Sequence, residues 1–166
     1  ERLAAASYGF DKAIFGYGTN PSGRSSLTNL VNNSGVVAAD VSGVGTARAV
    51  LAAASYGGDK AIFGYGVSSP NVSLTNLVSN SGVVAADTTG VGTARQALSA
   101  VGYGGDKAIF AFGTTGSRTN ISNLVSNSGV VASDTTGVGT ARNELAGASY
   151  GGDKGIFGYG STGSRV

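Results

Sequence analysis

The stretch Ala54–Gly66, which reads Ala-Ser-Tyr-Gly-Gly-Asp-Lys-Ala-Ile-Phe-Gly-Tyr-Gly, decides how this chain folds. Near-copies of it occur four times, and their first tyrosines lie 48, 47 and 47 residues apart. These tyrosines are Tyr8, Tyr56, Tyr103 and Tyr150. A repeat at a fixed period of this length is the signature of an architecture built from similar supersecondary units. The sequence therefore predicts an array of units rather than one irregular domain.

Two further blocks recur in the same register. Leu74–Val78 reads Leu-Thr-Asn-Leu-Val, and its counterparts open at Leu27 and Ile121. Asn80–Asp87 reads Asn-Ser-Gly-Val-Val-Ala-Ala-Asp, and the unit then closes in Gly-Val-Gly-Thr-Ala-Arg at Arg95. These blocks divide the chain into repeat 1 (3–50), repeat 2 (51–97), repeat 3 (98–144) and a half repeat (145–166).

Each full repeat is expected to contain four short antiparallel strands, as repeat 2 illustrates. Leu51–Tyr56 is small and apolar, and the Gly-Gly-Asp-Lys that follows is typical of a tight turn. Ala61–Tyr65 is an uninterrupted apolar run, which suits a strand covered on both faces. Ser73–Val78 and Val83–Ala86 are the expected third and fourth strands, separated by an Asn-Ser-Gly turn. A helix over Leu51–Ser55 is the alternative, but five residues are too few for a stable helix.

Four antiparallel strands in a unit of about 47 residues match the blade of a β-propeller. The predicted fold is therefore all-β, with tandem four-stranded antiparallel repeats arranged like propeller blades. In this arrangement the apolar second strand lies between neighbouring blades. The Ala- and Gly-rich first strand lies where the blades crowd together. The 29 glycines fit a chain with many turns between short strands.

The order of these features resembles the kelch repeat family. Kelch units run from Ala-Arg through small apolar residues and a tight glycine turn into an apolar strand that ends in a glycine pair. Here that order is given by Ala94-Arg95, Leu98–Val101, Gly104-Gly105 and Ala108–Phe110. The chain departs from the pattern where Tyr65 separates Gly64 from Gly66, and where Val83 or Val84 replaces the usual Trp. The copies also look like tandem arrays of phage and environmental sequences, and an extracellular or virion-surface location is favoured.

The charged residues argue against an enzyme. Histidine and cysteine are absent, which removes the commonest general base and the thiol nucleophile. Of 20 formal charges, 14 repeat in register: Asp11, Asp59, Asp106, Asp153, Asp40, Asp87, Asp134, Lys12, Lys60, Lys107, Lys154, Arg48, Arg95 and Arg142. An active site needs different groups that converge once, so charges copied into every unit are expected to serve the fold. We therefore predict no catalytic site, no cofactor and no metal.

The repeated charges have specific expected roles. The Asp of the first turn and the Asp after the fourth strand are each expected to accept hydrogen bonds from their own turn. A repeated calcium site is the alternative, but one Asp per unit does not supply six to eight oxygen ligands. The Arg that closes each unit is expected to bond carbonyls or an Asp of the adjacent unit, with a ligand-binding ring of arginines as the alternative. The aromatic residues before the third strand are expected to pack in the core rather than stack on sugars or bases; they are Tyr17, Tyr65, Phe112 and Tyr159.

The loop between the second and third strands differs in every copy, whereas the rest is nearly identical. These variable loops are Thr19–Ser26, Val67–Ser73 and Thr114–Asn120. The candidate partner-binding residues in them and in the half repeat are Asn20, Arg24, Asn71, Arg118 and Arg165. A varied loop on a constant scaffold is where specific recognition is expected, with free drift as the alternative. A surface protein or a glycan is the expected partner. A net charge of +2 without a basic run argues against nucleic acid, and no apolar stretch is long enough for a membrane helix.

Two functions remain open at this level. In the first, the chain is a non-catalytic repeat scaffold or binding module, part of a larger β-propeller or a fibre-borne adhesion module. In the second, it is a structural subunit that self-assembles through an open β edge into a closed oligomer or a filament. The sequence stops within a fourth repeat, and Gly155–Tyr159 is apolar on both faces. Such a strand is prone to pair when uncovered, so further chain or another copy is expected to cover it.

Overall fold

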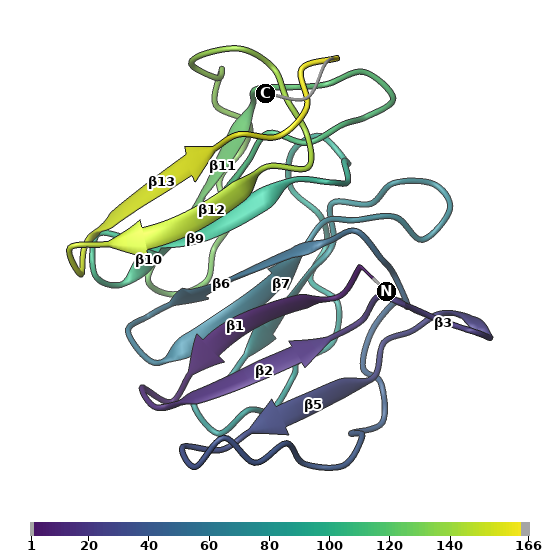
Figure 1. Ribbon diagram of the computed structural model, residues 1–166, viewed down its shortest axis with the longest axis vertical. Helices are drawn as coiled ribbons and strands as arrows, with labels where there is room; N and C mark the ends of the chain where they lie inside the picture. The colour runs from purple at the N-terminus through teal and green to yellow at the C-terminus, as the bar shows by residue number, and fades with distance from the viewer. Residues whose placement is uncertain (1, 164–166) are drawn as a thin grey trace.

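The computed structural model describes residues 2–163, which form antiparallel strands, turns and loops and no helix. Figure 1 shows the sheets following one another along the long axis of the molecule. Repeats 1, 2 and 3 form the sheets β1-β2-β5, β6-β7-β8 and β11-β10-β9, and the half repeat forms the hairpin β12-β13. The predicted all-β class is confirmed.

The strand bounds are β1 Ala4–Tyr8, β2 Lys12–Gly16, β3 Thr19–Asn20, β4 Gly23–Arg24, β5 Thr28–Val31, β6 Ala52–Tyr56, β7 Lys60–Gly64, β8 Thr75–Val78, β9 Ser99–Tyr103, β10 Lys107–Ala111, β11 Ser122–Val125, β12 Ala146–Tyr150 and β13 Lys154–Gly158. The first three strands predicted for repeat 2 agree with β6, β7 and β8 to within two residues at each end. β3 and β4 form a separate small hairpin inside the variable loop of repeat 1.

The first hairpin of each unit is closed by the glycine turn that the sequence predicts. In repeat 2, Tyr56 pairs with Lys60 across β6 and β7. Gly57 and Gly58 in that turn have φ angles of 62° and 80°. This left-handed region favours glycine, which explains the glycine pair in three of the copies; in the first copy Phe10 takes the second position with a φ of 69°.

The predicted fourth strand, Val83–Ala86, does not form a continuous strand. The segment runs antiparallel to β8 and meets it at two isolated bridges, one between Val78 and Val84 and one between Thr75 and Thr88. Between these bridges the Asn76 side chain donates a hydrogen bond to the Ala85 carbonyl at 3.0 Å. A side chain thus bridges the interruption of the backbone ladder. Repeats 1 and 3 have the same pair of bridges. Each full repeat is therefore a three-stranded sheet followed by a segment that pairs with the third strand only at two isolated bridges.

The hydrophobic core lies between neighbouring units. In β7, Ala61 and Phe63 belong to the cluster shared with repeat 1, whereas Ile62 belongs to the cluster shared with repeat 3. All three side chains are fully buried. The prediction that this apolar run is covered on both faces is confirmed. Each unit therefore depends on its neighbours to bury its apolar surface.

The first strands β1, β6, β9 and β12 lie against one another in that order (Figure 1). Their small residues allow this approach, and the Ser55 hydroxyl donates a hydrogen bond to the Ser7 carbonyl of the preceding unit at 2.8 Å. Backbone hydrogen bonds tie both ends of the hairpins together. At one end the Gly57 N–H donates to the Asp106 carbonyl at 2.7 Å. At the other end the Ala97 N–H donates to the Val50 carbonyl at 3.0 Å.

Gly64 marks a close approach between two units and gives a first prediction. A Cβ at this position would lie 2.6 Å from the ring of Phe110 in the next unit. We expect Gly64→Ala to lower the free energy of unfolding by about 1–3 kcal/mol, the usual effect of overpacking a core. Urea unfolding measures this loss. The equivalent Gly158 has no atom within 4 Å of such a Cβ, so Gly158→Ala is the matched control. Equal losses in both variants would show that the contact with the ring is not the cause.

Candidate functional site

The closing Thr-Ala-Arg of each repeat docks onto the next repeat. Arg48 is fully buried; its Nε donates to the Tyr65 carbonyl at 2.9 Å and its Nη2 to Asn76 Oδ1 at 2.6 Å. The guanidinium carbon also lies 4.4 Å from the centroid of the Tyr17 ring in its own repeat. This geometry joins two units through one side chain. The predicted inter-unit role of the arginine is confirmed.

Arg95 repeats most of this arrangement between repeats 2 and 3, although its Nη2 donates to the Phe110 carbonyl at 3.4 Å and not to an Asn side chain. Its Nε donates to the Phe112 carbonyl at 2.8 Å, and its guanidinium lies 4.3 Å from the centroid of the Tyr65 ring. Burial lowers the pKa of Arg95 and raises the pKa of Tyr65 to about 12. An arginine in a protein keeps its charge, so neither group changes its protonation near neutral pH. Both side chains hold the stack and are not exposed to a ligand. Tyr17 is buried in the same way, which confirms the predicted packing role for the aromatic residues of repeats 1 and 2. The same prediction is wrong for Tyr159, which is 77% exposed because no further described unit packs on the half repeat.

The Asp after the predicted fourth strand bonds the preceding repeat rather than its own turn. The Thr46 N–H and hydroxyl donate to Asp87 Oδ2 at 2.9 and 2.6 Å, and Asn76 Nδ2 donates to Asp87 Oδ1 at 2.9 Å. Partial burial by itself would raise the pKa of Asp87, but these hydrogen bonds outweigh it, and the pKa is lowered. The expectation of a bond within its own turn is therefore corrected. The cause is tertiary, because the Gly-Val-Gly-Thr loop of one unit places Thr46 over the next.

The Asp of the first turn connects the two turns of its own unit. Asp59 Oδ2 accepts a hydrogen bond from Asn80 Nδ2 at 2.9 Å, and Oδ1 lies 3.4 Å from Lys60 Nζ. The bond from Asn80 is the main reason that the pKa of Asp59 is lowered. The role is structural, as predicted, although the partner from Asn-Ser-Gly was not foreseen. Within residues 2–163 there is no group of three or more His, Cys, Asp or Glu that could hold a metal ion.

Asp59→Ala is expected to lower the thermal midpoint modestly and to leave the metal content unchanged. The reason is that the substitution removes the hydrogen bond from Asn80, whereas Asp59 does not belong to a group of metal ligands among the described residues. Thermal unfolding and elemental analysis measure the two quantities. Asp153→Ala is the matched control, since the side-chain hydrogen bond of Asp153 within the described chain comes from Lys154 alone. Stoichiometric calcium that disappears with Asp59→Ala would overturn this account.

The variable loops contact one another from unit to unit. Asn71 Nδ2 donates to the Thr114 carbonyl of the next loop at 3.4 Å. Arg118 donates from Nε to Asn143 Oδ1 and from Nη2 to Ser161 Oγ, both at 3.2 Å. The candidate residues Asn71 and Arg118 are therefore partly used within the stack. They make the loops one continuous edge of the molecule.

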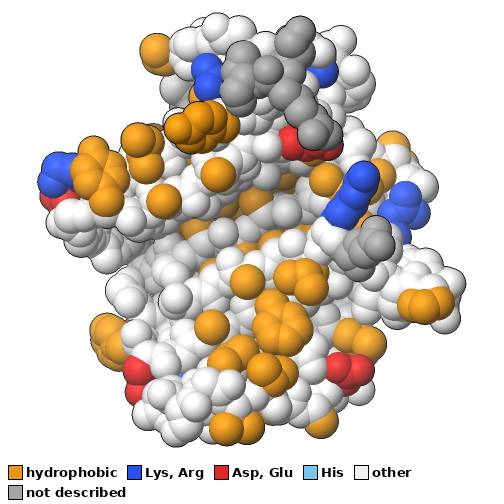
Figure 2. Space-filling model, viewed as in Figure 1, with side chains coloured by type: hydrophobic (Ala, Val, Ile, Leu, Met, Phe, Trp, Pro, Cys, Tyr) orange, Lys and Arg blue, Asp and Glu red, His pale blue; other side chains and the backbone are white. Residues whose placement is uncertain are grey.

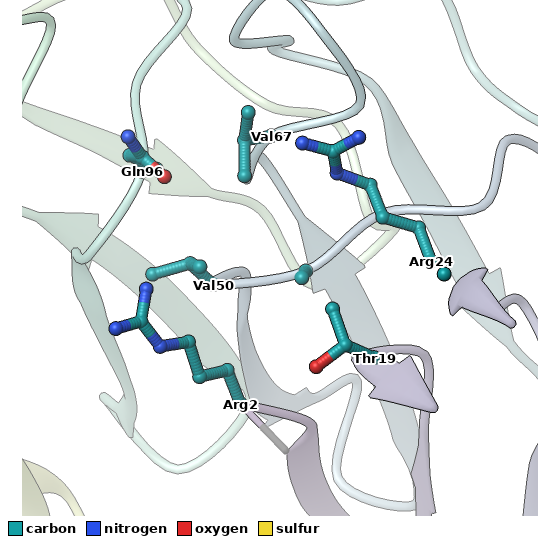
Figure 3. A pocket seen from close by; sticks show the side chains of 8 residues that line it. Arg2, Thr19, Arg24, Val50, Val67 and Gln96 are labelled. Atoms are coloured by element: carbon teal, nitrogen blue, oxygen red, sulfur yellow. The ribbon is translucent and has the colours of Figure 1, made fainter. Parts of the chain in front are cut away.

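The remaining candidates lie in repeat 1 or outside the described residues. Asn20 Oδ1 accepts a hydrogen bond from the Ser22 N–H inside the β3–β4 hairpin at 2.9 Å. The guanidinium of Arg24 has no hydrogen bond or ion pair to the described part of the chain, and it borders a pocket of about 570 Å³. Arg2 borders the same pocket (Figure 3). Arg165 lies outside the described residues.

Sequence reasoning missed three of the residues that organise these sites. Asn76 and Thr46 hold the repeated Asp, and their signal was present, because both positions recur inside the constant blocks Leu-Thr-Asn-Leu-Val and Gly-Val-Gly-Thr. Arg2 has no such signal. Its counterparts in the later repeats are Val50, Ala97 and Glu144, so only the fold brings it to the pocket.

Comparison with known proteins adds no family to this picture. Among residues 2–163, no helix is long and apolar enough to cross a membrane. No family model matches this chain, and no curated protein matches it.

Proposed function

We propose that this chain is a non-catalytic repeat scaffold whose variable loops form a binding surface for a surface protein or a glycan. One observation carries the proposal: the constant residues Arg48, Arg95 and Asp87 bond between units inside the stack, whereas the loops that differ lie along one shared edge. Arg48 and Arg95 are buried between units. Asn71 connects the loop of repeat 2 to that of repeat 3, and Arg118 connects the loop of repeat 3 to the half repeat. Binding residues are commonly found on variable loops that a constant scaffold positions.

The buried network also supports a non-catalytic role. Its Asp side chains are held by Thr and Asn, and its Arg and Tyr side chains are held by carbonyls and rings. Groups that transfer protons need a free lone pair or proton close to a substrate. The lone pairs and protons of these groups are used by hydrogen bonds inside the stack.

The finer architecture is part of the proposal. We propose kelch-like blades within a larger β-propeller or a fibre-borne adhesion module. The face-to-face packing of the sheets and the crowding of the small first strands support this arrangement. The mass of the native particle, measured by light scattering, tests it. One longer chain with more blades supports the proposal, and a particle of 166-residue chains favours the second function below.

A glycan array tests the binding surface directly. The comparison uses the native chain and a variant in which Thr19–Ser26 and Thr114–Asn120 are replaced by Gly-Ser segments of equal length. We expect binding to at least one glycan class, lost in the loop variant while its thermal midpoint changes little. A matched variant, Asp11→Asn in the opposite turn, is expected to bind like the native chain. Equal binding by the loop variant would contradict the proposal.

The second candidate function is self-assembly through the exposed hairpin β12–β13. Tyr150, Ile156 and Tyr159 are 54%, 57% and 77% exposed. Their counterparts in repeat 2, Tyr56, Ile62 and Tyr65, are 4%, 0% and 0% exposed, because repeat 3 covers them. Figure 2 shows apolar side chains at the upper left of the molecule, where β12 and β13 lie. A matching apolar surface on another copy would cover this face.

The opposite end of the stack offers such a surface. Phe15 in β2 is half-buried, whereas its counterpart Phe63 is fully buried against Tyr17 of the preceding unit. The β12–β13 hairpin of one copy can therefore pack on repeat 1 of another copy through the same kind of contact that joins neighbouring units within one chain. This contact is head-to-tail and leads to a filament or, if it closes, a ring.

Substitution of the exposed face tests self-assembly. Ile156→Lys is expected to leave a monomer at concentrations where the native chain forms larger species in analytical ultracentrifugation. Phe10→Lys is the control. Phe10 is exposed in the first turn, and its counterpart Gly58 has open space around it, so the position makes no inter-unit contact. A native chain that is monomeric at every concentration would remove this candidate.

A further inference from the structure

The loop arginines have different surroundings although they occupy the same position. Isolated bridges join Ala49 to Val67, Gln96 to Thr114, and Asn143 to Ser161, which makes these three pairs structural equivalents in successive units. Arg118 donates hydrogen bonds to the side chains of the pair that follows it, Asn143 and Ser161. Asn71 reaches the backbone of the pair that follows it, at Thr114.

Arg24 meets a pair that has no acceptor side chain. The bridged pair beside it consists of Ala49, at the end of its own repeat, and Val67, in the next repeat, and both line the same pocket as Arg24. Figure 3 shows the Arg24 side chain extending toward Val67. The guanidinium is thus placed as in Arg118 but lacks the two oxygens that Arg118 binds. Because a guanidinium offers five N–H donors in a planar fork, an unfilled position of this kind favours an oxyanion from outside the chain.

A second arginine borders this pocket. Arg2 extends beside Val50, and Gln96 lies across the pocket from it (Figure 3). None of the described residues that line the pocket is acidic. Arg2 also borders a smaller hollow that contains Glu144, so Arg24 is the main anchor and Arg2 the auxiliary one. Figure 2 shows basic side chains together at the right-hand edge of this face.

We propose that this pocket, which we call the Arg24 pocket, binds the carboxylate of an acidic saccharide. Its volume of about 570 Å³ is within the range of about 300–1,000 Å³ that small-ligand sites span. Two guanidinium groups match a carboxylate by charge and by bidentate geometry. The Gln96 amide supplies a donor and an acceptor for hydroxyl groups, and Val50 and Val67 give an apolar wall for a sugar ring. The proposal rests on the proposed binding function of the loops and names its ligand class.

The test uses trigalacturonate as the probe in isothermal titration calorimetry, with its methyl ester and inorganic phosphate as the other arms. We expect trigalacturonate to bind with a Kd of about 1 mM or tighter, and the uncharged ester to bind at least about tenfold more weakly. Equal binding of acid and ester would overturn the proposal. Binding of phosphate at Arg24 without binding of trigalacturonate would also overturn it, because the site would then take a phosphate.

Variants assign the binding to the Arg24 pocket. Arg24→Ala is expected to weaken binding by about tenfold or more, and Arg24→Lys by an intermediate factor, because lysine keeps the charge but not the fork. Arg142→Ala is the matched control, since that arginine lies outside the variable loops and donates to the Thr140 and Tyr159 carbonyls, and it is expected to bind like the native protein. Unchanged binding by Arg24→Ala would overturn the proposal.

The strictest variant adds hydrogen-bond acceptors from the chain itself beside the Arg24 guanidinium. Ala49→Asn with Val67→Ser gives Arg24 the same pair that Arg118 has, and other repeats already accommodate Gln or Asn at the first of these positions. We expect this double variant to stay folded and to lose binding of trigalacturonate by about tenfold. Full binding by the folded double variant would overturn the proposal. If the loop replacement abolishes binding of other glycans but Arg24→Ala has no effect, this inference alone fails. If neither has an effect, the proposed function fails with it.

Discussion

Arg95→Ala is expected to lower the free energy of unfolding by about 3–5 kcal/mol, because it removes a buried charged side chain that joins two units. The guanidinium is fully buried between repeats 2 and 3. Its removal leaves the Phe112 carbonyl without its donor and takes away the cation that faces the Tyr65 ring. A buried acceptor that loses its partner is not resolvated, so the whole desolvation penalty remains.

Guanidinium unfolding followed by circular dichroism measures this loss. Arg142→Ala is the matched control, because Arg142 closes repeat 3 in the same sequence context but is only half-buried. Its guanidinium carbon lies 5.5 Å from the Phe112 centroid, against 4.3 Å for the contact of Arg95 with Tyr65. We expect a loss of less than about 1 kcal/mol there. Similar small losses in both variants would show that the arginines do not hold the units together.

Phe110→Ala is expected to have an effect of the same size, about 3–5 kcal/mol, through a cavity between two units. The ring is fully buried and packs edge-on against Tyr65, with a centroid distance of 5.1 Å. It also fills the space above Gly64. The equivalent Phe157 is only half-buried and lies 5.9 Å from Phe112, so Phe157→Ala is expected to lose less than half as much. Equal losses, measured by the same unfolding experiment, would contradict a core placed between units.

The sequence predicts the local part of this fold well. The first hairpin follows from turn chemistry, because Gly57 and Gly58 adopt the left-handed conformation that the Gly-Gly-Asp-Lys pattern requires. The two-sided burial of Ala61, Ile62 and Phe63 follows from an apolar run without alternation. The prediction of a continuous fourth strand was wrong, because the Asn76 side chain donates to the Ala85 carbonyl in place of a backbone hydrogen bond from β8. Strand propensity does not reveal that a side chain takes the place of a backbone hydrogen bond.

The candidate site was predictable only in part. Variation among the copies indicated the loops, and Arg24 was among the residues it selected. What distinguishes Arg24 from Arg118 is the bridged pair of residues beside it, one from the end of its own repeat and one from the next unit. That pairing joins positions about 25 and 43 residues away from each arginine and depends on the packing of units. Arg2 reaches the pocket for the same reason, so no local pattern marks it.

Hydrogen exchange at the amides that bridge the units tests the central claim most directly, which is that the sheets form one cooperative stack. The Gly57 N–H donates to the Asp106 carbonyl, and the Ala97 N–H donates to the Val50 carbonyl. If the units hold each other, these amides open only with global unfolding and exchange as slowly as the slowest amides of the β6–β7–β8 sheet. Fast exchange of Gly57 and Ala97, with that sheet still protected, would contradict the account and show that the sheets are independent units.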